Sequence, residues 1–407
     1  MGLKNMPRRE FLKTAAAATA GLVIVKPESV RGAPANSALR IGVIGCGGRG
    51  RFVSRFFPEH TTAKIVAIAD PFKDRVDRLR KELESDKKTK SGAALDDAHC
   101  FVGLDSYKGV IESGVDAVLV ESPPYFHPLH VAAVVDAGKH VYIAKPVAVD
   151  APGCQSIIAS AEKAKTRNLS FLVDFQTRAT DFYIEAAKRV HEGAIGNPVS
   201  GHVYYIAGRL GAQADPKDKS DAARLRNWVF DKILSGDIIV EQNVHVLDVS
   251  NWFLQSHPIK ASGTGGRKAR VDVGDCWDHF VVTFWYPNDV LMDFSSAQYT
   301  RGYDDLCCRI YGNQGTVDSH YGGSVKITGN SPWAGGETTA IYRDGAVANV
   351  KAFVEGIETG KPVNYGARGA ESTLTAILGR TAAYRGATIT WDEMMKENEK
   401  LETTLRI

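Results

Sequence analysis

The stretch LRIGVIGCGGRG at residues 39–50 decides the fold of this chain. Its first half, residues 39–44, is apolar and predicts a short buried strand. Its second half is a G-x-G-x-x-G, and apolar residues at helical spacing follow at residues 52–57. A strand, a glycine turn and a helix in this order indicate a unit that binds a dinucleotide.

The glycine turn predicts how such a dinucleotide is held. Gly45 permits the tight turn, Gly47 lets the backbone approach the pyrophosphate, and Gly50 lets helix and strand pack closely. The N-terminus of the helix that follows, with Gly48 and Arg49 in the turn before it, adds unpaired N–H groups and the positive end of its dipole. We therefore predict that these five residues bind the cofactor. A glycine turn in some other α/β protein stays open as the alternative.

A carboxylate at the end of the next strand predicts which dinucleotide is bound. Residues 65–69 are apolar and end at Asp70, twenty residues past Gly50. A carboxylate here accepts hydrogen bonds from the adenosine ribose hydroxyls and repels a 2′-phosphate. We expect NAD rather than NADP, although Lys73 and Arg75 lie close by and weaken that preference.

Strands and helices continue to alternate along the first half of the chain. Strand-like runs at 115–120, 140–143 and 171–175 are separated by helical patterns such as 127–137. This alternation predicts a doubly wound parallel sheet over residues 36–175. Ligands of such sheets lie at the carboxyl ends of the strands. Residues at these ends that we expect to line the cofactor site are Ser122, Pro123, His127, Lys145 and Gln176.

The pattern changes after about residue 193. Runs rich in β-forming residues, such as 203–206 and 280–286, are separated by turns and predict a mainly antiparallel, open sheet over residues 176–365. A helix is expected from about 237 to 254. The last segment, 366–407, is predicted to be helical and to pack back on the body. The fold class is then α/β plus α+β, with a Rossmann domain followed by an open sheet domain.

The first 35 residues predict an export signal. Arg8 and Arg9 precede Phe-Leu-Lys, an apolar run spans residues 14–25, and Ala-Pro-Ala follows at 33–35. This order resembles a twin-arginine signal, although Pro7 stands where Ser or Thr is usual. An ordinary amphipathic start is the alternative. We expect a periplasmic or otherwise exported protein, and tight retention of NAD because little is free outside the cytoplasm.

Composition excludes several classes of function. The 407 residues have a formal net charge of +3 with both signs interspersed, so no nucleic-acid footprint appears. No apolar run after the N-terminus is long enough to span a membrane, so we expect no membrane association once the signal is removed. The six cysteines form no C-x-x-C pair and are predicted to be buried free thiols. We predict no metal site.

Three further motifs resemble the Gfo/Idh/MocA family, which includes glucose–fructose oxidoreductase and inositol dehydrogenase. They are SPP at 122–124 with His127, AGKHV at 137–141 leading into AKP at 144–146, and E-x-x-x-H-x-x-D at 241–248. The resemblance covers nearly all of the chain after the signal. It implies a Rossmann domain joined to an open sheet domain, redox chemistry on sugars or cyclitols, and homodimers or homotetramers.

The resemblance also implies catalytic roles. His245 is the expected general acid/base, Glu241 contacts the substrate or the histidine, and Lys145 donates to the substrate oxygen beside the nicotinamide. Glu241 and His245 are four apart and would share one face of a helix. They could instead be an ordinary helix pair, or two metal ligands without an evident third. Ala144 replaces the glutamate of the family's Glu-Lys-Pro, and Glu241 replaces its aspartate.

Weaker candidates for gripping a carbohydrate are Arg178, Arg226 and Trp228, with Arg224 and His279 behind them. Aromatic faces stack on sugar C–H surfaces and arginines donate to hydroxyls. Each of these residues is equally expected as an ordinary structural residue. His127 is expected to cap a helix or to line the cofactor cleft rather than to do chemistry.

Three functions remain open on these residues. The first is an NAD-dependent oxidoreductase acting on a secondary hydroxyl of a sugar, glycoside or cyclitol. The second is an NAD-dependent glycoside hydrolase that works through a transient 3-keto intermediate and elimination, because it needs the same cofactor and side chains. The third is a non-catalytic sugar-binding protein, against which the intact glycine turn and the set of Lys145, Glu241 and His245 argue.

Overall fold

The computed structural model describes residues 38–85 and 95–405. The predicted export signal, residues 1–35, lies outside the described residues. In the part of the chain that is described, no helix combines the length and the apolar character needed to cross a bilayer.

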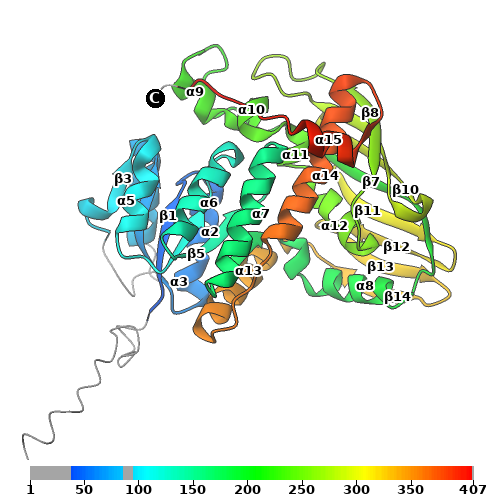
Figure 1. The fold of residues 1–407 in the computed structure, drawn as a ribbon, viewed down its shortest axis with the longest axis horizontal. Coiled ribbons are helices and arrows are strands. Elements are labelled where there is room, and N and C mark those ends of the chain that lie inside the picture. Colours follow the sequence, from blue (N-terminus) through cyan, green and yellow to red (C-terminus); the bar gives the residue numbers. More distant parts are fainter. Residues whose placement is uncertain (1–37, 86–94, 406–407) are drawn as a thin grey trace, which may run out of the picture. The chain divides into compact units, whose positions relative to one another are not determined.

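The first half of the described chain forms a parallel sheet of six strands in the order β3-β2-β1-β4-β5-β6 (Figure 1). The strand order reverses between β1 and β4, which is where a doubly wound sheet opens a crevice for ligands. The strands are β1 (Arg40–Ile44), β2 (Lys64–Asp70), β3 (Cys100–Val102), β4 (Ala117–Val120), β5 (His140–Ala144) and β6 (Phe171–Asp174).

Helices cover both faces of this sheet, so its central strands are buried throughout. In β4, Val118 and Val120 belong to one apolar cluster while Ala117 and Leu119 belong to the other. The covering helices are α2 (Gly48–Ser54), α3 (Phe56–His60), α4 (Lys73–Ser85), α5 (Tyr107–Glu112), α6 (His127–Asp136), α7 (Ala151–Thr166) and, from late in the chain, α13 (Ile341–Glu358).

The second sheet has nine strands in the order β14-β13-β12-β11-β7-β10-β9-β8-β15. Every neighbouring pair is antiparallel except β7 and β10, which are parallel. The predicted combination of a parallel and a mainly antiparallel sheet is therefore confirmed. The strands are β7 (Pro198–Gly208), β8 (Lys260–Gly266), β9 (His279–Trp285), β10 (Leu291–Thr300), β11 (Asp305–Gly312), β12 (Gly315–His320), β13 (Ser324–Gly329), β14 (Trp333–Glu337) and β15 (Ile389–Thr390).

One face of the second sheet is covered by α8 (Asp181–His191), α12 (Val244–Leu254) and α14 (Gly366–Arg385). Helix α14 also packs against α7 and thus joins the two sheets of the described body (Figure 1). The remaining helices are short: α9 (Asp221–Arg226), α10 (Lys232–Ser235), α11 (Ile238–Glu241), α15 (Trp391–Glu397) and the 3₁₀ turns η3 (Asp97–His99), η4 (Leu104–Ser106), η5 (Pro124–Phe126), η6 (Thr177–Ala179), η7 (Trp228–Phe230) and η8 (Pro287–Asp289).

The single helix expected over residues 237–254 is wrong. The amides of Gln242 and Asn243 both donate to the carbonyl of Ile238, at 2.9 and 3.0 Å, so the regular hydrogen-bond ladder stops there. The chain therefore forms α11 and then α12. Glu241 ends the first and His245 lies in the second, so the two side chains do not share one helix face.

The six cysteines are free, as predicted. Five are buried, but Cys100 at the edge strand β3 is partly exposed, which corrects the expectation of burial for all six. An edge strand has a neighbour on one side only, so its side chains are covered less completely than those of the central strands.

Candidate active site

The glycine turn after β1 is shaped by close backbone approaches. Gly45 has φ of +101°, and a Cβ there would lie 2.5 Å from the carbonyl oxygen of Glu121. A Cβ on Gly50 would overlap the carbonyl oxygen of Gly45. At Gly47 and Gly48, in contrast, a Cβ would meet nothing within 4 Å. Gly45 and Gly50 therefore allow the tight turn, while Gly47 and Gly48 leave room for a phosphate.

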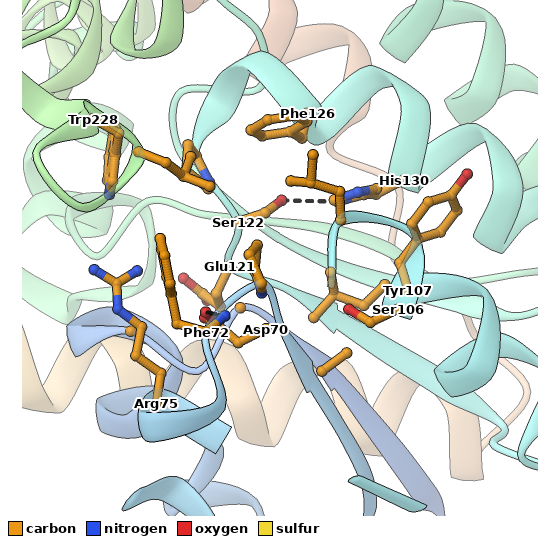
Figure 2. Close-up of a pocket in the computed structure, with 18 of the residues that line it drawn as sticks. Asp70, Phe72, Arg75, Ser106, Tyr107, Glu121, Ser122, Phe126, His130 and Trp228 are labelled. Carbon is orange, nitrogen blue, oxygen red and sulfur yellow. Dashed lines mark hydrogen bonds between the residues drawn. The ribbon is translucent and has the colours of Figure 1, made fainter. Parts of the chain in front are cut away.

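The turn borders a pocket that we call the dinucleotide pocket. It extends from the ends of β2 and β4 to Trp228, which comes from the second half of the chain (Figure 2). Phe72 and Arg75 also line it, and the guanidinium of Arg75 lies 5.1 Å from the ring centroid of Phe72. The pocket thus offers a glycine turn for phosphates and flat apolar surface for a base.

Asp70 lines this pocket at the end of β2. One oxygen of its carboxylate accepts a hydrogen bond from the amide of Cys46 and the other from that of Phe72, each at 2.9 Å. Burial raises the pKa of Asp70 in spite of these bonds. A carboxylate oxygen has two acceptor sites, so both oxygens can still accept from ribose hydroxyls.

The segment around α9 borders the dinucleotide pocket through Leu225 and Trp228. Arg226 pairs with Asp74 of α4 at 2.6 and 3.1 Å, and its guanidinium lies 3.9 Å from the ring centroid of Phe72. Arg226 was expected to bind substrate, but the structure places it at the nucleotide end. Trp228 lines this pocket and the next one.

A second pocket, which we call the substrate pocket, adjoins the first. The two share Arg49, Glu121, Ser122 and Trp228. The further residues on its wall come from the ends of β5 and β6, from α11 and α12, and from β7 and α13. They include Lys145, Gln176, Tyr205, Glu241, His245 and Tyr342.

Lys145 and Glu241 meet in the substrate pocket. The Nζ of Lys145 donates to the main-chain carbonyl of Glu241 and lies 3.2 Å from its Oε1. Both side chains are mostly buried. The structure thus brings an ammonium and a carboxylate, predicted from residues 96 positions apart, to one point of the pocket wall.

His245 lies in the same pocket and makes no hydrogen bond to Glu241, which is also described. Its ring packs between Phe175 and Tyr321, with ring centroids 6.1 and 5.5 Å away. Its Nδ1 is buried and has no hydrogen-bond partner among the described residues. Burial, and then the charges of Lys145 and Arg49, lower the pKa of His245 well below its usual value. The ring is therefore neutral at neutral pH.

His127 holds the pocket wall together. Its Nδ1 lies 2.9 Å from the carbonyl oxygen of Pro146 and its Nε2 2.7 Å from that of Ser122. Burial lowers the pKa of His127 to about 4, so the neutral ring donates to one of these carbonyls at a time. The loops after β4 and β5 are thereby tied to each other. Ser122 also bonds to His130, at 2.9 Å (Figure 2).

Arg178 lies outside both pockets. It makes three hydrogen bonds of 2.8 to 3.0 Å to the buried carboxylate of Asp248, which also accepts from Ser372. Two weaker candidates pair in the same way, Arg224 with Asp231 and His279 with Asp278. Of the predicted substrate residues, the pocket therefore brings together Trp228, Glu241 and His245, and not Arg178 or Arg226.

One cluster with metal-ligand side chains occurs in residues 38–85 and 95–405, away from both pockets. It consists of Asp305, Cys307 and His320, on β11 and β12. The neighbouring carboxylates raise the pKa of His320, and burial raises the pKa of Cys307 to about 12. The Cys307 thiol therefore holds a proton that a cation would have to displace, and the raised pKa of His320 favours the protonated ring over the form that binds a metal. Glu241 and His245 belong to no such cluster.

Sequence reasoning missed several residues of the substrate pocket, above all Glu121 and Asp174. Arg49 of the glycine turn pairs with Asp174, at the end of β6. Both carboxylate oxygens of Glu121 are buried without a partner, and burial raises the pKa of Glu121 to about 8. Both acids end or follow a buried strand of the parallel sheet, which was the signal that could have revealed them.

Comparison with known proteins agrees with this geometry. Residues 39–171 match the oxidoreductase family with an NAD-binding Rossmann fold, and residues 183–318 match the GFO/IDH/MocA C-terminal domain. The chain belongs to the GFO/IDH/MocA family. It is an oxidoreductase of the kind that acts on a CH–OH group, and its cofactor is NAD.

Several curated relatives are inositol dehydrogenases. Inositol 2-dehydrogenase 3 of Saccharopolyspora erythraea is 27% identical over 84% of this chain and 92% of that protein. The scyllo-inositol 2-dehydrogenase (NAD(+)) of Bacillus subtilis is 25% identical over 69% of this chain and 73% of that protein.

Solved structures share the fold. The aldose–aldose oxidoreductase of Caulobacter crescentus, complexed with glycerol, superposes with a TM-score of 0.69 at 19% identity, over 87% of this chain and 99% of that one. A levoglucosan dehydrogenase, complexed with NADH and levoglucosan, gives a TM-score of 0.68 at 17% identity, with the same coverage.

The residues present fit NAD. Gly47 and Gly48 border open space at a helix N-terminus, where a pyrophosphate is stabilised. The Nη1 of Arg49 and the carboxylate of Glu121 are buried polar groups without partners beside that space. Buried polar groups are normally hydrogen-bonded, so these atoms point to a ligand that supplies the missing partners.

Proposed function

We propose that this protein oxidises a secondary hydroxyl of a sugar, glycoside or cyclitol and holds its NAD tightly. The observation that supports this most is the meeting of Lys145, Glu241 and His245 in one pocket that adjoins the dinucleotide pocket. The relatives named as inositol dehydrogenases, and the structural neighbours named for aldoses and levoglucosan, support a polyhydroxylated substrate.

The side chains divide the work as follows. When bound, NAD accepts a hydride from the carbon that carries the hydroxyl. His245 is neutral and its Nδ1 has no partner in the described part of the chain, so it can take the hydroxyl proton. Lys145 donates a hydrogen bond to the substrate oxygen and stabilises its developing negative charge. Glu241 holds Lys145 in place and accepts from a substrate hydroxyl.

Retention of the cofactor is supported by the segment that covers it. Arg226 ties the segment to Asp74 of α4, and Leu225 and Trp228 line the pocket from the same segment. A dinucleotide seated below this segment leaves only after the segment moves. A twin-arginine signal would suit such a protein, because that route carries proteins that have already folded.

The retained cofactor is tested first. We expect purified protein, denatured without added cofactor, to release NAD, detected by chromatography. An empty preparation that binds added NAD only weakly would contradict retention.

The reaction is tested with a panel of glycosides, polyols and cyclitols. Absorbance at the reduced nicotinamide band and products by NMR are followed together. Net formation of a keto-sugar supports the dehydrogenase. Transient reduction with net release of the aglycone would identify the redox-assisted glycoside hydrolase instead. Binding without either signal would identify a sugar-binding protein and contradict the proposal.

Two further expectations belong to this proposal. We propose export through residues 1–35, tested by whether Arg8→Lys with Arg9→Lys stops periplasmic accumulation. We propose a homodimer or homotetramer that pairs through the open face of the second sheet, where Val281 and Leu291 are exposed. Light scattering on wild type and on a variant with Val281→Glu tests the assembly.

A further inference from the structure

The two pockets meet where the dinucleotide has to pass from one to the other. Asp70 and Arg75 line one end of the dinucleotide pocket, and the glycine turn lines its middle. Lys145 and His245 lie in the substrate pocket. A dinucleotide with its pyrophosphate on the turn therefore brings its second half past the residues that both pockets share, among them Glu121.

Glu121 is an unmatched acid at this junction. It follows β4 directly, and both of its carboxylate oxygens are buried without a hydrogen-bond partner among the described residues. The burial raises the pKa of Glu121 to about 8, although the positive charges of Arg49 and Lys145 act in the opposite direction. A buried carboxyl without a partner destabilises a protein, so its place in a pocket wall indicates that a ligand completes it.

Glu121 could instead serve only to balance the positive charge of Arg49. Arg49 already forms an ion pair with Asp174, a fully buried carboxylate that also accepts from the Nδ2 of Asn349 at 2.9 Å. The positive charge of Arg49 is thus matched without Glu121. Burial of a second acid beside this pair is therefore not explained by charge balance alone.

The sheet register shows what Glu121 replaces. The last residue pair of β4 and β5 is Val120 with Ile143, so Glu121 and Ala144 follow it side by side. Ala144 stands where the family pattern has the glutamate of Glu-Lys-Pro. Carboxylates therefore flank this position on both neighbouring strands, Asp174 on the β6 side, where it pairs with Arg49, and Glu121 without a partner on the β4 side.

We propose that Glu121 binds the nicotinamide half of the dinucleotide. Its carboxylate accepts a hydrogen bond from a donor on that half, a ribose hydroxyl or the carboxamide N–H. With a pKa of about 8 the carboxyl is mostly protonated before the dinucleotide binds; it ionises beside the positively charged oxidised ring, and its negative charge then favours that ring over the neutral reduced ring. The inference rests on the proposed use of NAD and adds a residue that selects its oxidised form.

The test is a set of binding measurements on protein stripped of cofactor, by calorimetry with NAD⁺, NADH and ADP. ADP lacks the nicotinamide half and reports whether the rest of the pocket is intact. We expect Glu121→Gln to lower the affinity for NAD⁺ by about tenfold or more, which is the value of one hydrogen bond to a charged group. The affinity for NADH should fall less, and the affinity for ADP should equal that of the wild type.

Two further variants sharpen the result. Glu121→Ala combined with Ala144→Glu returns a carboxylate to the same edge of the sheet and should recover most of the NAD⁺ affinity lost in Glu121→Ala alone. Glu112→Gln removes an exposed acid of the same domain and serves as the matched control.

Unchanged NAD⁺ affinity in Glu121→Gln would overturn the inference, and so would an equal loss for NAD⁺ and ADP, which marks a purely structural role. Equal losses for NAD⁺ and NADH would overturn the selection of the oxidised ring. Failure of the wild type to bind NAD⁺ would instead contradict the proposed function, so the two failures are distinguishable.

Discussion

The two pockets of this protein are built in different ways. The dinucleotide pocket depends on backbone geometry in a short, continuous stretch, where Gly45 and Gly50 allow close approach and Gly47 and Gly48 leave space. The substrate pocket collects side chains from many elements far apart in the chain, from Arg49 on α2 to Tyr342 on α13. Removing a glycine should therefore affect how the pocket is shaped, whereas removing a side chain should affect what the pocket does.

The largest expected effect belongs to the substrate pocket. We expect His245→Ala to lower turnover by about 10²- to 10⁴-fold, because the hydroxyl proton loses its acceptor. Bound NAD should remain at the wild-type level, measured on the same preparation. His191→Ala, at an exposed histidine, is the control. Turnover near that of the wild type would show that another group takes the proton.

The buried histidines of the wall make stability depend on pH. The folded-state pKa of His127 is lowered to about 4, so between pH 6.5 and 4 the unfolded chain binds a proton that the folded protein does not. Unfolding is favoured as the pH falls, by up to about 3 kcal/mol from this residue. Denaturant titrations of wild type and His127→Asn between pH 7 and 4 measure the difference. If the free energy of unfolding falls equally in both proteins as the pH is lowered, His127 is not the source of the pH dependence.

The glycine turn offers a matched pair of substitutions. Gly50→Ala forces a Cβ into the carbonyl of Gly45, so we expect a loss of stability of about 1–3 kcal/mol together with loss of NAD binding. In Gly48→Ala the new Cβ contacts no protein atom, so the melting temperature should stay unchanged while the affinity for NAD falls. If Gly48→Ala binds NAD as the wild type does, the phosphate does not lie against this residue.

Asp70 tests the choice between the two dinucleotides. We expect Asp70→Ala to narrow the preference for NAD over NADP by about tenfold, the value of one hydrogen bond to a charged group. Some stability should also be lost, because the amides of Cys46 and Phe72 lose their acceptor. Affinities for both dinucleotides, with melting curves, separate the two effects. Unchanged discrimination would leave Asp70 with its structural role alone.

The smallest expected effect is at the pocket rim. Arg226→Ala removes an exposed ion pair with Asp74, worth about 0.2–1 kcal/mol. Release of NAD, measured after dilution, should therefore accelerate by about 1.4- to fivefold. Arg343→Ala, which breaks another exposed pair, should leave release unchanged. No acceleration in Arg226→Ala would mean that Trp228 and Leu225 hold the segment closed without it.

The sequence predicted well what short stretches determine by themselves. The strand before Gly45 and the strand that ends at Asp70 both occur, because buried apolar runs and glycine positions are local properties. The break between Glu241 and Val244 was not predicted. It arises because the amides of Gln242 and Asn243 both donate to the carbonyl of Ile238, and the spacing of residue types in the sequence does not predict this.

Side-chain partners were the least predictable feature. Arg178 and Arg226 were expected at a substrate, but each found a carboxylate that is distant in the sequence, Asp248 and Asp74. Glu121 went unnoticed for the opposite reason. What marks it is the absence of a partner in a buried place, which becomes visible only after the surrounding strands and helices are assembled.

Trp228 belongs to the walls of both pockets. A movement of its segment that is large enough to let the coenzyme leave would also open the wall of the substrate pocket. The protein then cannot exchange its coenzyme while a substrate is bound. If the coenzyme is retained as proposed, a second substrate has to take the hydride back before the next turnover, and the steady-state kinetics should then follow a ping-pong pattern.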